Sequence, residues 1–243
     1  MLQVLQYLMG IRPGIPELLW RYLVPMSKMI VIVSGGEIEE EHALSILRAE
    51  DSCYVIGVDK GVEFLYSHDI MPNYIVGDFD SVRPEIADYY RKDTSVPIRE
   101  FNPVKDASDT EIAIRLAVTL GCKQMLILGA TGGRIDHLWA NIQCLAIPFK
   151  SGIDARILDR QNSIRLIGGR TVLKRGETYG AYFSVFPLGQ EVFRFNITGA
   201  KYPLKNHVLT AYDSLCVSNQ IEDDEVVIDF AGGIVVLMET RDL

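Results

Sequence analysis

The chain has 243 residues, of which 48% are hydrophobic and 23% are charged, and it carries a formal net charge of −8. This composition is typical of a globular protein with a sizeable core, and the length fits one large domain or two small ones. The acidic balance argues against a nucleic-acid-binding face, which needs clustered lysine and arginine, and it is compatible with a cationic substrate. No apolar stretch reaches the roughly 18 residues that a spanning helix needs, so we expect no membrane partner.

The cysteines lie far apart in the chain and form no C-x-x-C pair. This spacing predicts neither a zinc site nor a disulfide framework, and it favours reduced core cysteines in a cytoplasmic protein. They are Cys53, Cys122, Cys144 and Cys216.

Residues 1–28 differ from the rest of the chain. They are apolar but are interrupted by prolines, and they lack the basic start and small-residue cleavage site of a signal peptide. Met26 and Met29 stand directly before the first strand-like run. We expect the functional protein to begin at one of these methionines, with residues 1–28 as an extension of unclear role; a docked amphipathic arm is the alternative.

From Met29 onward, continuous apolar runs alternate with helical patterns. Such runs are typical of parallel strands covered on both faces, so the pattern predicts an α/β domain with a mostly parallel sheet. The expected strands are 29–33, 53–58, 74–76, 96–101 and 124–128, and the expected helices include 62–68, 84–90 and 109–120.

The run Val76-Gly77-Asp78-Phe79-Asp80-Ser81 follows a short buried strand. In an open α/β sheet, ligands bind at the carboxyl ends of the strands. A loop can turn both carboxylates toward one ion, and hard oxygen ligands of this kind suit Mg²⁺ together with substrate phosphates. The alternative is that Asp78 and Asp80 are turn and cap residues, which aspartate also favours.

A second acidic segment opens the helix expected at 109–120. Ser108 with Glu111 three residues later is a capping-box pattern, which places Asp106 just before the helix and Asp109 in its first turn. Acidic residues stabilise a first turn through the helix dipole, and this explains Asp109 but not Asp106 or the neighbouring Lys105.

A glycine-rich segment, residues 129–137, follows the strand 124–128 and precedes a further helix. Glycines in this position let the backbone approach a phosphate and direct N–H groups toward it. It is not a Walker A loop, because the chain has no G-x-x-x-x-G-K-[ST] sequence. The polar residues around the glycines are Thr131, Arg134, Asp136 and His137.

Two side chains near this segment have plainer interpretations. His137 can simply cap the next helix. Trp139 has helical spacing with Ile142, which favours a core position over a stacking platform.

The periodicity changes near residue 155, where short strand-like runs with turn signals replace the alternation. This pattern predicts an antiparallel sandwich or barrel as the second domain. We expect an α/β domain at 29–158 and a β domain at 159–243, with strands at 163–167, 181–186, 192–196, 213–217, 225–230 and 234–239.

The ends of four expected strands and the start of one helix should meet at one edge of the sheet. Together they supply carboxylates for a metal, glycines for phosphate approach, and the cations Lys105 and Arg134. Phosphoryl-type transfer needs such positioning and charge neutralisation more than covalent help.

These segments resemble the bacterial type of the thiamine pyrophosphokinase (thiamine diphosphokinase) family. The resemblance lies in Val76-Gly-Asp-Phe-Asp-Ser81, Lys105-Asp-x-x-Asp109 and Gly129-x-Thr-Gly-Gly-Arg-x-Asp-His137, with Asp59-Lys-Gly61 and Ser218-Asn219 fitting the same pattern. It extends from about residue 29 to the C-terminus, and three motifs in order are far more specific than one. Lys60 departs from the usual glycine, and Ser108 from the frequent threonine.

The resemblance implies a homodimer with an α/β nucleotide-binding domain and a C-terminal β domain for thiamine binding and dimerisation. It implies transfer of diphosphate from ATP to the hydroxyethyl oxygen of thiamine, giving AMP and thiamine diphosphate. The implied catalytic and Mg²⁺ residues are Asp78, Asp80, Asp106 and Asp109; those for ATP are Gly35, Gly36, Asp59, Lys105, Thr131, Gly132, Arg134, Asp136 and His137; those for thiamine are Ser218 and Asn219. Asp109 is our first choice of general base.

Three alternatives stay open at this point. One is a diphosphokinase acting on another hydroxymethyl substrate, such as a pterin. The others are a non-catalytic nucleotide sensor that keeps the loops without turnover, and a metal-dependent phosphohydrolase.

Overall fold

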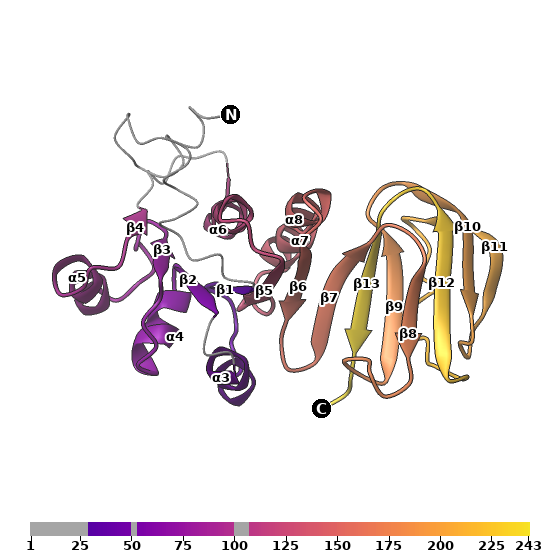
Figure 1. Ribbon diagram of the computed structural model, residues 1–243, viewed down its shortest axis with the longest axis horizontal. Helices are drawn as coiled ribbons and strands as arrows, with labels where there is room; N and C mark the ends of the chain where they lie inside the picture. Colours follow the sequence, from indigo (N-terminus) through magenta and orange to yellow (C-terminus); the bar gives the residue numbers. More distant parts are fainter. Residues whose placement is uncertain (1–28, 50–52, 100–106) are drawn as a thin grey trace. The chain divides into compact units, whose positions relative to one another are not determined.

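The structure is a computed structural model that describes residues 29–49, 53–99 and 107–243. The chain divides into two compact units between Ala155 and Arg156. Figure 1 shows the elements of both units.

The first unit contains a parallel sheet with strand order β4-β3-β2-β1-β5. Strands β2, β3 and β4 follow β1 in order on one side of it, and β5 pairs with β1 on the other side. The strands are β1 (Met29–Val33), β2 (Tyr54–Val58), β3 (Tyr74–Val76), β4 (Ile98–Arg99) and β5 (Gln124–Leu128).

Helices connect these strands and cover both faces of the sheet (Figure 1). Helix α6 packs on α7 and α8, and it also contacts β1, β2 and β3, while α4 packs against β1 and β2. The helices are α3 (Glu40–Ala49), α4 (Gly61–Ser67), α5 (Pro84–Lys92), α6 (Asp109–Thr119), α7 (Ile135–Cys144) and α8 (Ala146–Lys150).

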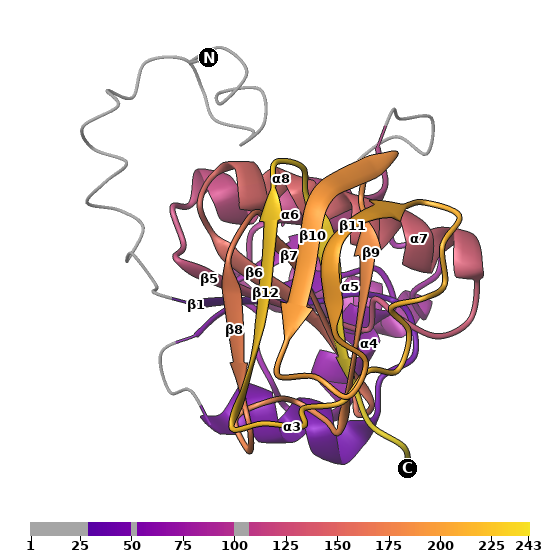
Figure 2. The ribbon, with the colours of Figure 1, turned by 90° about the vertical axis from the view of Figure 1, so that its right-hand side faces the viewer.

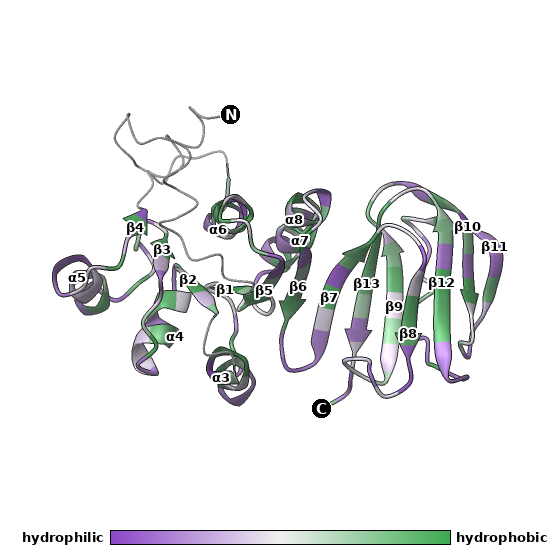
Figure 3. Ribbon diagram, in the orientation of Figure 1, coloured by the Kyte–Doolittle hydropathy of each residue, from purple (hydrophilic) through white to green (hydrophobic). Residues whose placement is uncertain are grey.

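Burial follows the pattern expected for a doubly covered sheet. Residues 30–33 of β1 are at most 1% exposed, and the parallel strands are mostly hydrophobic in colour in Figure 3. Helix α6 begins where the capping pattern predicts, because the Ser108 hydroxyl oxygen accepts a hydrogen bond from the Glu111 N–H at 3.2 Å. Of the expected strand 96–101, only Ile98–Arg99 is a strand among the described residues, and residues 100 and 101 lie outside them.

The second unit is a sandwich of antiparallel strands. The strands β6-β7-β13-β9 are neighbours in one sheet, and a second, four-stranded sheet has the order β11-β10-β12-β8, seen in Figure 2. The strands are β6 (Asp154–Leu158), which begins at the boundary, β7 (Asn162–Ile167), β8 (Thr171–Lys174), β9 (Tyr182–Pro187), β10 (Glu191–Thr198), β11 (Leu204–Thr210), β12 (Glu225–Ala231) and β13 (Val235–Thr240).

The two sheets of the second unit enclose one apolar core. Phe183, Phe195, Ile228 and Leu237 are among its fully buried residues, and they come from four different strands. Buried positions alternate with more exposed ones along β12. The predicted fold class, a parallel α/β domain followed by an antiparallel β domain, is therefore confirmed.

One expected strand in this unit was wrong, and three strands, β6, β8 and β11, were not predicted. Residues 213–217 form turns, in which the Asp213 carboxylate accepts the Leu215 N–H at 2.7 Å. Strands β8 and β11 lie at the edges of their sheet, where a mixed polar sequence is tolerated. Within the described part of the chain, no helix combines the length and apolar character needed to cross a membrane.

Candidate active site

The strand order places a topological switch point between β1 and β5. The chain leaves β1 in one direction along the sheet and returns on its other side at β5. Ligands of open α/β sheets bind outside the carboxyl ends of the strands at such a point. The loops that follow these two strands are the predicted segments with Gly35 and Gly36 and with Thr131 and Gly132.

These two loops are hydrogen-bonded to each other. The Gly36 N–H donates to the Gly129 carbonyl at 2.7 Å, and the Glu37 N–H donates to the Thr131 carbonyl at 3.1 Å. A Cβ atom on Gly36 would lie 2.5 Å from the Gly129 oxygen and 2.6 Å from the Thr131 oxygen. Only glycine fits at position 36, because these oxygens belong to the backbone and cannot move aside.

The loop at Asp59 lies between two of the predicted glycines. A Cβ on Gly35 would be 3.3 Å from the Lys60 nitrogen, and a Cβ on Gly77 would be 2.5 Å from Asp59 Oδ1. Asp59 itself has a φ of +47°, a left-handed conformation that aspartate adopts more readily than most residues. Lys60 is exposed and directly precedes α4, so the departure from the family pattern places a lysine side chain at this edge of the sheet.

The aspartate loop, residues 77–83, turns back on itself after β3. Asp78 Oδ1 accepts the Asp80 N–H at 3.0 Å, and Phe79 between them has a φ of +61°. A hydrogen bond to the Asp78 carboxyl and the negative charge of Asp78 raise the pKa of Asp80, and the charge of Asp109 adds to this effect. Three predicted acidic residues from two separate segments therefore lie close enough to interact.

A buried hydroxyl pair fixes the helix that carries Asp109. Ser34 Oγ, at the end of β1, lies 2.5 Å from Thr110 Oγ1 in the first turn of α6. Both residues are buried. The pair was not predicted, because no sequence pattern links residues 76 positions apart.

In the glycine segment, Arg134 and Asp136 form a bidentate ion pair. Arg134 donates from Nε to Asp136 Oδ1 at 3.1 Å and from Nη2 to Asp136 Oδ2 at 2.5 Å, and both side chains are exposed. The hydrogen bond from Arg134 lowers the pKa of Asp136. The pair holds a planar cation in place at the end of the glycine segment, and such a cation suits phosphate recognition.

Helix α7, which follows this segment, makes one contact that was not predicted, and it carries one residue whose predicted position was wrong. The buried Asn141 donates from Nδ2 to the Ala130 carbonyl at 3.0 Å and so ties the glycine segment to α7. Trp139 is 54% exposed, so the expected core position was wrong, and Ile135 one turn earlier is 78% exposed. The predicted His137 is also exposed, and its backbone N–H donates to Asp136 Oδ1 at 3.0 Å.

The acidic cluster, formed by Asp78, Asp80 and Asp109, has the chemistry of a Mg²⁺ site. Its carboxylate oxygens are hard ligands, and the raised pKa of Asp80 marks an excess of negative charge that a cation would offset. Among the residues that the structure describes, however, no three histidine, cysteine, aspartate or glutamate side chains are already grouped as a complete metal site. Asp106 and Lys105 lie outside the described residues.

The predicted thiamine residues Ser218 and Asn219 lie in the second unit. Asn219 is 2% exposed, and its side-chain amide makes two hydrogen bonds with the backbone of Tyr202. Oδ1 accepts the Tyr202 N–H at 3.0 Å, and Nδ2 donates to the Tyr202 carbonyl at 2.8 Å. Ser218 is exposed and has a φ of +56°, with its N–H donating to Ser184 Oγ at 3.0 Å. Asn219 thus holds the turn that presents Ser218.

Comparison with known proteins agrees with this arrangement. Residues 47–157 match the family model for the thiamin pyrophosphokinase catalytic domain, and residues 170–235 match that for the thiamin pyrophosphokinase vitamin B1 binding domain. The chain is 32% identical to the thiamine pyrophosphokinase of Bacillus subtilis over 217 residues, which is 88% of this chain and 100% of that protein. This chain belongs to the thiamine pyrophosphokinase family. The resemblance seen in its motifs is confirmed.

Solved structures of thiamine pyrophosphokinases have the same fold. The crystal structure from Bacillus subtilis superposes with a TM-score of 0.79 at 30% identity, over 89% of this chain and 100% of that one. The structure from Geobacillus thermodenitrificans gives 0.76 at 28% identity, over 88% and 98%. The yeast structure gives 0.73 at 18% identity, over 97% and 93%, a likeness of fold alone.

Proposed function

We propose that this protein transfers a diphosphate group from ATP to the hydroxyethyl oxygen of thiamine, giving thiamine diphosphate and AMP. Membership of the thiamine pyrophosphokinase family carries this proposal and makes the chain an ATP-dependent diphosphotransferase. The electrostatic interaction of Asp80 with Asp78 and Asp109 supports it independently of the comparisons. No observation favours a pterin substrate, a nucleotide sensor or a phosphohydrolase.

ATP lies, in this proposal, across the loops at the carboxyl ends of β1 and β5. The N–H groups of the glycine segment and the Arg134 guanidinium would bind its phosphates. The full proposed set for ATP is Gly35, Gly36, Asp59, Lys105, Thr131, Gly132, Arg134, Asp136 and His137.

The reaction breaks one bond and forms one bond at the β-phosphorus. The hydroxyethyl oxygen of thiamine attacks the β-phosphorus, the bond to the oxygen bridging the α-phosphorus breaks, and AMP departs with that oxygen. Asp109 is the proposed acceptor of the hydroxyl proton, although a loose transition state needs little help from a base. The acidic cluster also favours the thiazolium cation electrostatically.

Asp78, Asp80, Asp106 and Asp109 would hold Mg²⁺ together with the ATP phosphates. When bound, Mg²⁺ supplies positive charge that stabilises the phosphates and the departing AMP. The residues of the chain hold the two substrates in line and set where the proton goes.

The second unit is the proposed source of thiamine contacts and of a homodimer interface, with domain limits of 29–158 and 159–243 and an N-terminal extension at 1–28. Ser218, presented by the turn that Asn219 holds, is the exposed polar contact. Exposed apolar side chains support an interface in this unit: they include Phe193, Tyr202, Tyr212, Leu215 and Val217. All four cysteines are free thiols, which supports a cytoplasmic location.

Product analysis tests the proposal. Purified protein with ATP, Mg²⁺ and thiamine should release AMP and thiamine diphosphate in equal amounts. Without thiamine it should release neither product. ADP as the nucleotide product would indicate an ordinary kinase, phosphate release without thiamine would indicate a hydrolase, and turnover with a pterin alone would move the substrate assignment.

A further inference from the structure

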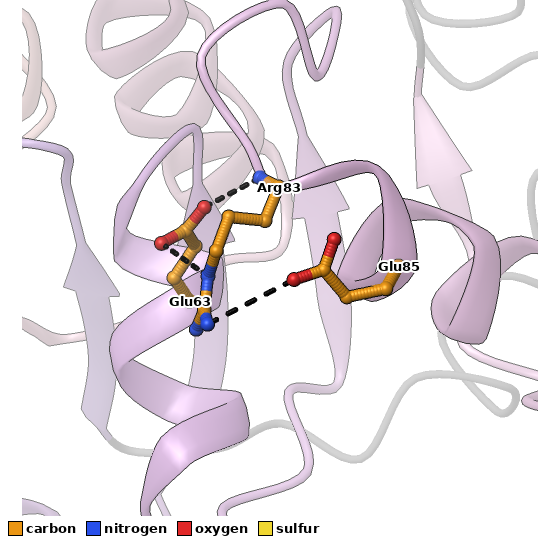
Figure 4. Close-up of polar contacts among 3 residues, drawn as sticks. All are labelled: Glu63, Arg83 and Glu85. Carbon is orange, nitrogen blue, oxygen red and sulfur yellow. Dashed lines mark hydrogen bonds and ion pairs between the residues drawn. The ribbon is translucent and has the colours of Figure 1, made fainter.

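The aspartate loop is held at its far end by one carboxylate from another helix. Glu63, in the first turn of α4, accepts the Arg83 N–H with Oε1 at 2.5 Å and the Arg83 Nε–H with Oε2 at 3.2 Å (Figure 4). Arg83 is the residue at which the loop ends and α5 begins. A single side chain therefore fixes both the backbone and the guanidinium at this junction.

This contact means that both ends of the aspartate loop are held by the segment that includes the start of α4. Helix α4 starts immediately after Asp59 and Lys60, and its first residue, Gly61, is packed so tightly that a Cβ would lie 2.0 Å from the Val33 carbonyl oxygen. The near end of the loop, at Gly77, lies against Asp59 in the same way. Glu63 links the far end of the loop to the same rigid helix start.

The middle of the loop has a conformation that its sequence disfavours. Phe79 adopts a φ of +61°, a left-handed conformation that non-glycine residues adopt rarely. Phe79 is 7% exposed and belongs to one apolar cluster with Val62, Ile86 and Tyr90, and the Arg91 guanidinium lies 4.8 Å from its ring centroid. Such strain persists only where the surroundings enforce the conformation. The surroundings here are the apolar packing of Phe79 and the fixed ends of the loop.

We propose that Glu63 is a positioning residue for the reaction: by holding the Arg83 N–H, it keeps Asp78 and Asp80 turned toward each other. The link to catalysis rests on the function proposed above, whereas the effect on the loop does not. Glu63 has no role as a ligand in this proposal. The Arg83 side chain and the more distant Glu85, whose carboxylate lies 3.9 Å from Arg83 Nη1, are secondary.

Amide hydrogen exchange of the full chain without metal or nucleotide tests the effect on the loop. The reporters are the amides of Asp80 and Val82, which donate to Asp78 Oδ1 and to the Phe79 carbonyl inside the loop. Glu63→Ala should speed exchange at both by about tenfold or more, with no change in β5. Glu85→Ala is the matched control and should leave both rates within about threefold of wild type, a threshold chosen to stay well below the loss of one hydrogen bond.

Two further variants separate backbone holding from charge pairing. Glu63→Gln keeps an oxygen for the Arg83 N–H, and Arg83→Ala keeps the N–H itself, so both should exchange nearly as slowly as wild type. Equal rates for Glu63→Ala and wild type, a uniform rise across the whole chain, or fast exchange in Glu63→Gln would each overturn the proposal.

Kinetics test the consequence for the reaction. Glu63→Ala should raise the Mg²⁺ concentration for half-maximal activity by about tenfold, as expected when the support of a metal-binding group is lost, and Glu63→Gln should restore it. An unchanged Mg²⁺ dependence in Glu63→Ala would overturn the positioning role. A wild-type protein that forms no thiamine diphosphate would instead reject the proposed function, while the exchange experiment would still report on the loop.

Discussion

Ser34 at the end of β1 and Thr110 in the first turn of α6 join their hydroxyl groups at 2.5 Å inside the protein. Gly35 and Gly36 follow the first residue, and Asp109 precedes the second. The pair thus connects the proposed phosphate-binding backbone to a proposed catalytic carboxylate. Its partners lie 76 positions apart in the sequence, so the connection forms only when the strand and the helix have packed together.

Removing one hydroxyl of this pair should cost more than removing both. Thr110→Val keeps the shape but leaves the Ser34 hydroxyl buried without its partner, which should lower the free energy of unfolding by about 1–3 kcal/mol. The double variant Ser34→Ala with Thr110→Val should recover part of that loss, and Thr110→Ser should be close to wild type. Urea denaturation measures all of them, and strictly additive losses would contradict the interpretation.

Neutralising the aspartate loop should abolish activity without unfolding the protein. Asp80→Asn removes a proposed metal ligand and should lower kcat by more than the roughly 10–100-fold typical of losing a supporting residue. It also removes like-charge repulsion from Asp78 and Asp109, so the melting temperature should stay equal or rise. Asp88→Asn, an exposed carboxylate paired with Lys92 on α5, is the control for activity. A severe loss of stability in Asp80→Asn would favour a turn-forming role for this residue.

Arg134 should affect ATP rather than thiamine. Arg134→Ala removes a charge-assisted contact to phosphate, which typically contributes about 1.5–3 kcal/mol, so KM for ATP should rise by about tenfold or more. Asp136→Asn should cause a smaller rise, because the guanidinium remains but loses its bidentate partner. Steady-state kinetics with each substrate varied in turn measure both, and an equal rise of KM for thiamine would place Arg134 elsewhere in the mechanism.

Asp213 should make the second unit sensitive to acid. The hydrogen bond from the Leu215 N–H has the largest effect on the pKa of Asp213 and lowers it from its ordinary value of 3.8. The hydrogen bond with the His207 side chain, at 3.0 Å, lowers it further. The folded protein therefore holds this proton less tightly than the unfolded chain, so the stabilisation is complete above about pH 4 and is lost as the pH falls through the lowered pKa. Asp213→Asn should flatten the loss of stability below pH 4, whereas Asp229→Asn, an exposed carboxylate on β12, should not.

The sequence was most informative where local chemistry decides the structure. The cap at Ser108 and the strand ends at Gly35, Asp59, Gly77 and Gly129 follow from residue types and short spacings. The edge strand β11 was missed because its residues Leu204–Thr210 show no regular alternation, and its pairing with β10 contains irregular register. The turn at 213–217 resembled a strand because its apolar residues hide the Asp213 hydrogen bond that bends it.

Long-range contacts account for what the sequence could not predict in the site. The left-handed conformation of Phe79 depends on packing against α4 and α5, and a pattern of residue types does not reveal such packing. The contact of Asn141 with Ala130 and that of Glu63 with Arg83 depend equally on how helices pack. Trp139 was misplaced because helical spacing identifies an apolar stripe without showing whether anything covers it.

The exposed indole of Trp139 gives the enzyme a built-in optical reporter. It lies on α7 a few residues after Arg134 and His137, and the only other tryptophan in the chain is Trp20. With Trp20 changed to phenylalanine, the emission spectrum would come from one fluorophore beside the proposed nucleotide loops. Titration with ATP should then shift or quench that emission, so substrate affinity could be followed without turnover and without an added dye.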